Sequence, residues 1–196
     1  MNKKIKRRSI FFVVIVVIVI FILYRYGYSL NENQALRISY PFIDGEVVYN
    51  KDFDNNKVVI WETENFNYLK QVDTKWGFLY QVSNVAMLQS MDPLIGTEGD
   101  LNRTWSSRLN SRNMYDTIFG VESVNPEIIR VIISNDSIDN VISYDIDEIK
   151  ENSTVFIELN LEDGFAASYN ELNTKDARGF IFRGLNDKGE ILILGR

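Results

Sequence analysis

An unbroken apolar run from Ile10 to Leu23, near the start of the chain, limits the possible folds more than any other feature. Five basic residues precede it within residues 1–8, and three tyrosines and an arginine follow it within residues 24–28. A bilayer requires about 20 helical residues. Residues 9–28 supply that length if the arginine reaches outward and the tyrosines lie among the headgroups. The run therefore predicts a transmembrane helix over residues 9–28.

Two other interpretations of this segment stay open. Small residues at Gly27 and Ser29, on either side of Tyr28, offer a cleavage point for a removable signal peptide. A buried core helix is the third interpretation, and the five cations at the chain end disfavour it. Because positive flanks stay in the cytoplasm, we expect a single-pass protein of the cell membrane. Residues 1–8 would be its cytoplasmic tail, and residues 29–196 would lie outside.

Residues 29–196 form an acidic body with a net charge near −12, because residues 1–28 hold six of the 21 basic residues and none of the 27 acidic ones. Such a body repels nucleic acid, so no nucleic-acid partner is expected. The chain also has no cysteine and no histidine. That composition excludes disulfides, thiol nucleophiles and Ser-His-Asp triads, and it removes the commonest zinc ligands. We expect no metal site, no cofactor and no enzymatic activity.

Runs rich in Val, Ile, Tyr, Phe and Trp predict a mainly β body. A first β subdomain over residues 46–88 is predicted to be an antiparallel meander with strands at 46–50, 57–63, 68–73 and 76–82. A second β subdomain over residues 114–196 is predicted to be a sandwich or open-barrel-like module. Its predicted strands are 116–123, 127–134, 140–145, 154–160, 165–169, 178–183 and 190–194, with a short helix at 145–152.

Two segments lack this pattern. Residues 29–45 predict a polar tether with at most a short ordered stretch. Residues 89–113 are rich in Ser, Asn and Arg and predict a long irregular connection. Because loops of this length are uncommon in compact domains, the connection either joins the two subdomains or carries function.

The basic N-terminal segment, the sequence KVVIWETENFNYLKQVDTKWGFLYQV at Lys57–Val82 and the sequence NPEIIRV from Asn125 carry a resemblance. In these segments the chain resembles uncharacterised single-pass, membrane-anchored proteins of Gram-positive, Bacillus-type bacteria. The likeness covers most of the body and rests on strand-and-turn patterns. It implies a β-rich envelope module and brings no known catalytic residues.

Residues 101–115 stand out in the acidic body because they contain three arginines and no acid. Arginine forks bind carboxylates and phosphates in two-point contacts, and a tryptophan in the same segment adds a stacking surface. The alternative is that these arginines pair with the protein's own surplus acids. The candidate partner-binding residues are Arg103, Trp105, Arg108 and Arg112.

Acidic clusters are weaker signals. Asp52, Asp54 and Asn56 have the spacing that begins a calcium loop, but Lys57 stands where the loop needs glycine. We interpret this cluster, and another that includes Asp136, as solvated turns.

Taken together, the sequence predicts a non-catalytic, membrane-anchored extracytoplasmic module for binding, sensing or complex assembly. The expected partners are the lipid bilayer and either an envelope protein or an anionic envelope component, and the oligomeric state is not predicted. One alternative is a membrane-associated immunity or accessory protein. Another is a carboxylate-dependent envelope hydrolase, since paired carboxylates cleave glycosides without histidine. A cleft with two facing, unpaired carboxylates would favour the hydrolase.

Overall fold

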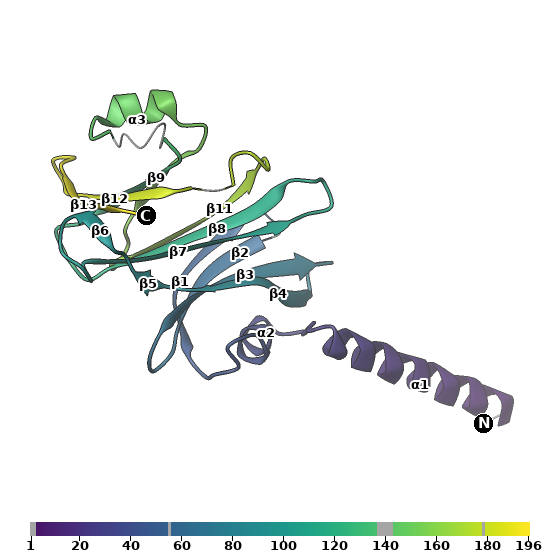
Figure 1. The fold of residues 1–196 in the computed structure, drawn as a ribbon. Helices are drawn as coiled ribbons and strands as arrows, with labels where there is room; N and C mark the ends of the chain where they lie inside the picture. The colour runs from purple at the N-terminus through teal and green to yellow at the C-terminus, as the bar shows by residue number, and fades with distance from the viewer. Residues whose placement is uncertain (1–2, 55, 137–142, 178) are drawn as a thin grey trace.

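Three antiparallel β-sheets are stacked in layers in a computed structural model that describes residues 3–54, 56–136, 143–177 and 179–196 (Figure 1). The first sheet, in the order β1-β2-β3-β4, has the bounds Glu46–Phe53, Asn56–Glu62, Asn67–Lys75 and Leu79–Met87. The middle sheet, in the order β11-β8-β7-β5, has the bounds Phe165–Leu172, Tyr115–Ser123, Leu101–Leu109 and Gln89–Ser90. The third sheet, in the order β10-β9-β12-β13-β6, has the bounds Phe156–Asn160, Arg130–Ser134, Ile181–Leu185, Ile191–Gly195 and Pro93–Ile95.

Short helices cover the outer faces of this stack (Figure 1). Helix α2 (Glu32–Ile38) begins at Asn31, whose side chain accepts a hydrogen bond from a main-chain N–H of the first turn. Its Leu36 packs on the first sheet. Helix α3 (Ile146–Asn152) lies beyond the third sheet and buries Ile149. The short helix predicted over residues 145–152 is thereby confirmed.

Strand β8 is buried on both faces because it lies in the middle layer. Successive side chains of a strand point to opposite faces. Ile118 belongs to the core between the first and middle sheets, and Phe119 to the core between the middle and third sheets. Gly120 faces the first sheet, where a Cβ would lie 2.7 Å from Cδ1 of Leu69. Glycine here allows the two sheets to approach closely.

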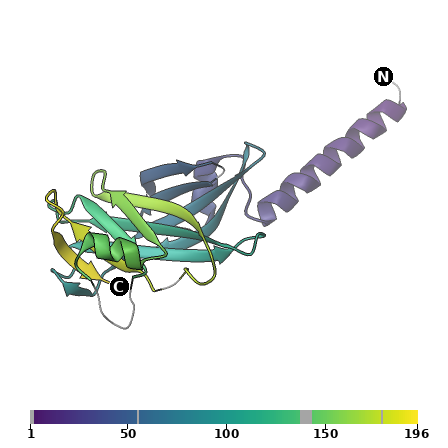
Figure 2. The ribbon, with the colours of Figure 1, turned by 90° about the horizontal axis from the view of Figure 1, so that it is seen from above.

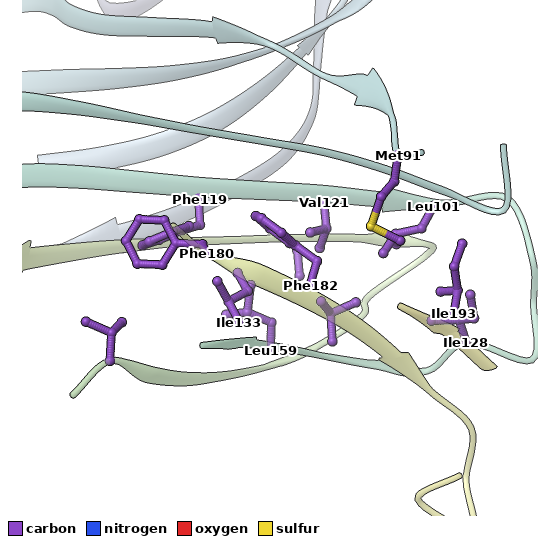
Figure 3. Packing of buried hydrophobic residues seen from close by; sticks show 13 residues of the cluster. Met91, Leu101, Phe119, Val121, Ile128, Ile133, Leu159, Phe180, Phe182 and Ile193 are labelled. Carbon is purple, nitrogen blue, oxygen red and sulfur yellow. The ribbon is translucent and has the colours of Figure 1, made fainter. Parts of the chain in front are cut away.

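The larger apolar core lies between the middle and third sheets (Figure 3). Phe119 and Val121 of β8 point toward Phe182 of β12, and Phe180 meets the ring of Phe119 edge to face, with centroids 4.7 Å apart. Aromatic pairs in this geometry contribute beyond their buried area. This packing joins the second half of the chain into one unit around β8.

Helix α1 (Lys3–Arg25) projects from the body, away from the sheets (Figures 1 and 2). It ends at Arg25, and residues 26–28 leave the helix, so helical structure does not extend to residue 28. The apolar run Ile10–Leu23 alone is about 21 Å of helix, against about 30 Å of hydrocarbon. No helix within the described residues combines the length and apolarity needed to cross a membrane. This finding contradicts the predicted transmembrane helix over residues 9–28 and the single-pass membrane localisation.

The mainly β prediction is confirmed for the body, but two connecting segments were misinterpreted. The tether of residues 29–45 contains α2, which packs on the first sheet. The connection of residues 89–113 contains β5, β6 and the nine-residue β7, which pairs along its whole length with β8. Of the strand predicted at residues 140–145, residues 140–142 lie outside the described part, and residues 143–145 are not in a strand.

Candidate functional site

The four candidate residues of segment 101–115 do not share one surface. Trp105 packs against the core between the middle and third sheets, and Arg103, two residues away on β7, faces the same side. Arg108 has the opposite parity and faces the first sheet, while Arg112 lies in the turn between β7 and β8. The structure therefore brings only Arg103 and Trp105 to the same face.

Arg108 and Arg112 form ion pairs with the protein's own acids. Nη2 of Arg108 lies 3.2 Å from Oδ2 of Asp73 in the first sheet and 3.7 Å from Oδ2 of Asp116 in the middle sheet. Nη2 of Arg112 lies 2.6 Å from Oε1 of Glu171 in β11. For these two arginines, the contacts favour the alternative in which the arginines pair with the protein's own surplus acids.

Arg103 and Trp105 contact the C-terminal part of the chain. Nη2 of Arg103 donates to the main-chain oxygen of Arg196, and its guanidinium lies 5.7 Å from the centre of the Phe182 ring. Burial lowers the pKa of Arg103. Trp105 meets Phe180 edge to face, with centroids 5.0 Å apart. A role for these residues in partner binding stays a prediction.

A groove of about 480 Å³ opens at one end of the β3–β4 pair, where four parts of the chain meet. Residues 62–67 contribute the turn between β2 and β3, and residues 87–90 contribute the passage from β4 into β5. Asn102 of β7 and Glu122 of β8 complete the lining. We call this the acidic groove. Residues of the first sheet and of the middle sheet line it together, so neither sheet forms the groove alone.

Local hydrogen bonds fix the shape of the groove. The Thr63 hydroxyl donates to the carbonyl of Phe66 at 2.6 Å, and the Phe66 N–H donates back to that hydroxyl at 3.2 Å. This closed turn holds the Phe66 ring at the exposed rim. Across the groove, Asn102 and Glu122 are direct partners in the β7–β8 ladder, and Nδ2 of Asn102 donates to Oε2 of Glu122 at 3.1 Å.

The chemistry of the groove suits a positively charged ligand. Glu62 and Glu64 are exposed and Glu122 is half-buried, and no lysine or arginine is among the residues that line the groove in the described structure. Carboxylates bind ammonium and guanidinium groups through charge-assisted hydrogen bonds. Side-chain amides around them, such as that of Asn65, supply donors and acceptors for neutral groups.

Lys70 of β3 is a buried charged group that no sequence pattern predicts. Its side chain is 0% exposed, between the first sheet and α2. Nζ donates to the carbonyl of Leu36 at 2.9 Å and to the hydroxyl of Ser39 at 3.0 Å, and it lies 4.9 Å from the centre of the Trp61 ring. Burial lowers the pKa of Lys70 to about 8. The ammonium therefore caps the C-terminal end of α2, where main-chain carbonyls lack helical partners.

A second buried pair corrects the interpretation of Asp136 as part of a solvated turn. The guanidinium of Arg183 donates to both carboxylate oxygens of Asp136, at 3.0 and 2.7 Å, and to the hydroxyl of Ser134 at 2.6 Å. Arg183 and Asp136 are both buried. The contact joins the end of β9 to β12, and its role is structural.

Acidic side chains elsewhere do not gather around a common point. Among the residues that the structure describes, no group of three or more acidic side chains could hold a metal ion. Asp52, from the calcium-like spacing, lies 3.6 Å from Nζ of Lys57.

Sequence reasoning missed the acidic groove because its parts are distant in the chain. The strands predicted at residues 57–63 and 68–73 leave Glu64 in a turn, but nothing in the sequence places Glu122 beside it. Comparison with known proteins identifies no relative, since no family model, no curated protein and no solved structure matches this chain. The resemblance to membrane-anchored proteins of Bacillus-type bacteria therefore stays a prediction.

Proposed function

We propose that this chain is a non-catalytic binding module that holds a positively charged segment of a partner protein in the acidic groove. One observation supports this more than any other. Three carboxylates line a single groove, and its described lining contains no cation. The net charge near −12 of residues 29–196 acts in the same direction at longer range, because it attracts basic partners and repels anionic ones.

The groove offers a basic peptide three kinds of contact. Glu62 and Glu64 accept hydrogen bonds from a lysine or arginine side chain. The amides of Asn67 and Gln89 can pair with peptide groups, and the exposed Phe66 ring can cover the aliphatic part of a long side chain. Exposed ion pairs contribute only about 0.2–1 kcal/mol each. We therefore expect modest affinity that falls as salt is added.

A titration with a short lysine-containing peptide tests this function. The probe is compared with the same peptide carrying acetylated lysines, which lack the charge. The Glu62→Lys/Glu64→Lys variant of the full chain should bind the charged peptide about tenfold more weakly, a loss of about 1.4 kcal/mol. The matched control is Glu151→Lys/Asp187→Lys, which makes the same change in net charge at exposed positions outside the groove.

The control separates a specific groove from general attraction. If both double variants lose affinity equally, the peptide responds only to net charge, and the groove is not its site. If the acetylated peptide binds as well as the charged one, the carboxylates do not recognise cations. Either result contradicts the proposed function.

A carboxylate-dependent hydrolase is the second candidate, because Glu62 and Glu64 have no ion-pair or hydrogen-bond partner for their carboxylates among the described residues. Glycoside cleavage usually needs one carboxylic acid kept protonated by an apolar environment, and both of these side chains are exposed. The binding function is therefore preferred. Turnover of a chromogenic glycoside that is lost in Glu62→Gln would favour the hydrolase instead.

A further inference from the structure

Helix α1 begins with a block of positive charge and projects from an acidic body (Figures 1 and 2). Residues 3–8 contain five basic residues, and the first acid of the chain is Glu32. The charge of this block is therefore not balanced by any acid nearby in the sequence. Blocks of like charge at the end of a chain often are interaction tails. We call residues 3–8 the basic segment.

The basic segment cannot reach the acidic groove of its own chain. Main-chain hydrogen bonds join Ser29 to Tyr80, and Nε2 of Gln81 donates to the carbonyl of Tyr26, so the base of α1 is fixed at the hairpin end of β4. The groove lies at the other end of the β3–β4 pair, about 30 Å away along the nine residues of β3. From its base, α1 extends about 34 Å away from the sheets (Figure 1). A groove that takes this segment must belong to another molecule.

Charge complementarity selects the basic segment as an occupant of the groove. Three glutamates line the groove, and its described lining contains no lysine or arginine. The other block of the chain with several cations and no acid is residues 101–115. In that block, Arg108 and Arg112 already form ion pairs with acids of their own body. The basic segment is thus the block whose sequence offers its cations to another molecule.

The size of the groove limits what it holds. Its volume of about 480 Å³ lies in the range of pockets that take small ligands, so it takes the ends of one or two long side chains rather than a whole helix. Carboxylates bind lysine and arginine side chains through charge-assisted hydrogen bonds. The exposed ring of Phe66 at the rim offers apolar surface to the aliphatic part of such a side chain.

We propose that the partner held in the acidic groove is a second copy of this chain, whose basic segment supplies the cations. This inference rests on the proposed function and names its partner. The contact is head to tail, because it joins two different surfaces that lie at opposite ends of the molecule. The apolar turns of α1 begin at Ile10, two residues after the basic segment, and they are exposed. A contact that covers part of them gains a hydrophobic contribution.

Sedimentation velocity of the full chain from about 1 to 100 µM tests this contact. We expect the weight-average sedimentation coefficient to rise with concentration. Glu62→Lys/Glu64→Lys reverses the charge of the exposed acids of the groove. Lys3→Glu/Lys4→Glu/Lys6→Glu reverses the charge of the basic segment, and acids are favourable at the N-terminus of a helix. Each variant alone should raise the dissociation constant of self-association at least about tenfold.

A mixture of the two variants gives the decisive result. The groove variant keeps a natural basic segment and the segment variant keeps a natural groove, so one molecule of each can form the proposed contact. Equimolar mixing should therefore restore association. The matched control is Glu151→Lys/Asp187→Lys, which makes the same change in net charge as the groove variant outside the groove and should associate like the natural protein. Far-UV circular dichroism checks that all variants keep the β-rich fold.

An engineered cysteine pair reports the contact directly, because the chain has no cysteine. Asn65→Cys places a thiol at the groove, and Arg8→Cys places one in the basic segment of a second molecule. Mild oxidation of the mixture should give a disulfide-linked heterodimer. The control is Lys188→Cys, an exposed position outside the groove, which should cross-link to Arg8→Cys at least about tenfold more slowly.

The outcomes separate this inference from the proposed function. If the natural chain stays monomeric but still binds the lysine-containing peptide, the groove serves another partner and only the second-copy inference is overturned. Equal association of the natural chain and both variants would mean that the apolar turns of α1 join the copies without the groove. A mixture that does not associate, or equal cross-linking at positions 65 and 188, would also overturn the inference. If the chain neither binds the peptide nor associates with itself, both proposals fail.

Discussion

Lys70 gives the sharpest test of the packing between α2 and the first sheet. It is fully buried, and among the described residues its ammonium has no carboxylate partner. It is held by the carbonyl of Leu36 and the hydroxyl of Ser39 alone, beside the ring of Trp61. Burial lowers the pKa of Lys70 from 10.5 to about 8. A charge that is disfavoured by burial should make stability depend on pH.

The sign and size of this dependence follow from linkage. Between pH 8 and pH 10.5 the unfolded chain keeps the Lys70 proton and the folded chain releases it. The unfolded state then binds more protons, so the free energy of unfolding rises with pH in this window. The difference between the two pKa values corresponds to about 3 kcal/mol, which the folded state bears in full below pH 8.

Denaturant unfolding of the natural protein and of Lys70→Met from pH 6 to pH 10 measures this term. Methionine keeps the length of the side chain and removes the charge, and all other titrating groups are common to both proteins. The stability of the natural protein relative to the variant should be constant below about pH 7.5 and should then rise by about 2–3 kcal/mol toward pH 10. A constant or falling difference would show that the carbonyl of Leu36 and the ring of Trp61 stabilise the ammonium, and would refute the reasoning.

Two further predictions concern the layers. Gly120→Ala should lower the free energy of unfolding by about 1–3 kcal/mol, because its Cβ would lie 2.7 Å from Cδ1 of the buried Leu69, so that one of the two residues must shift within a packed core. Leu69→Ala should then cost less in the Gly120→Ala background than in the natural protein, and additive losses in the double-mutant cycle would contradict this contact. Arg183→Leu should cost about 3–5 kcal/mol because it leaves Asp136 buried without its partner. Arg183→Leu/Asp136→Leu should recover most of that loss in denaturant unfolding, and a double variant no more stable than the single one would contradict the pairing.

Local pattern was enough to predict the first sheet. Its strands alternate with turn-forming residues such as Asp54, and neighbouring strands pair in sequence order. One boundary was wrong: residues 76–78, predicted to begin the fourth strand, form the turn between β3 and β4. The sequence signal failed for β7. This strand carries Asn, Arg, Thr and Ser, which usually mark exposed irregular segments, yet it lies in the middle sheet. Its polar residues are tolerated because they meet partners, as where Ser106 exchanges hydrogen bonds with Asn84 of β4.

Burial of Lys70 was not predictable for a related reason. In the sequence it stands between Leu69 and Gln71. In a sheet with one face exposed to solvent, apolar and polar residues alternate, and a lysine at this position would point into the solvent. Both faces of β3 are covered, one by the middle sheet and the other by α2. Helix α2 lies in the segment predicted to be a tether. The environment of Lys70 therefore depends on a tertiary contact that no local sequence pattern indicates.

The arginine segment suggested a ligand site because the sequence does not show which partners its arginines contact. An arginine that binds a partner's carboxylate and one that joins two sheets use the same contacts and occur in the same sequence pattern. Arg108 contacts Asp73 of the first sheet and Asp116 of the middle sheet, so it joins two layers that both carry negative charge. Arg112 joins the β7–β8 turn to β11 in the same way. A stacked body with this excess of acid needs cations where its layers meet. Glu62 and Glu64 in the acidic groove have no such cation among the described residues, and the proposed function assigns them to a partner.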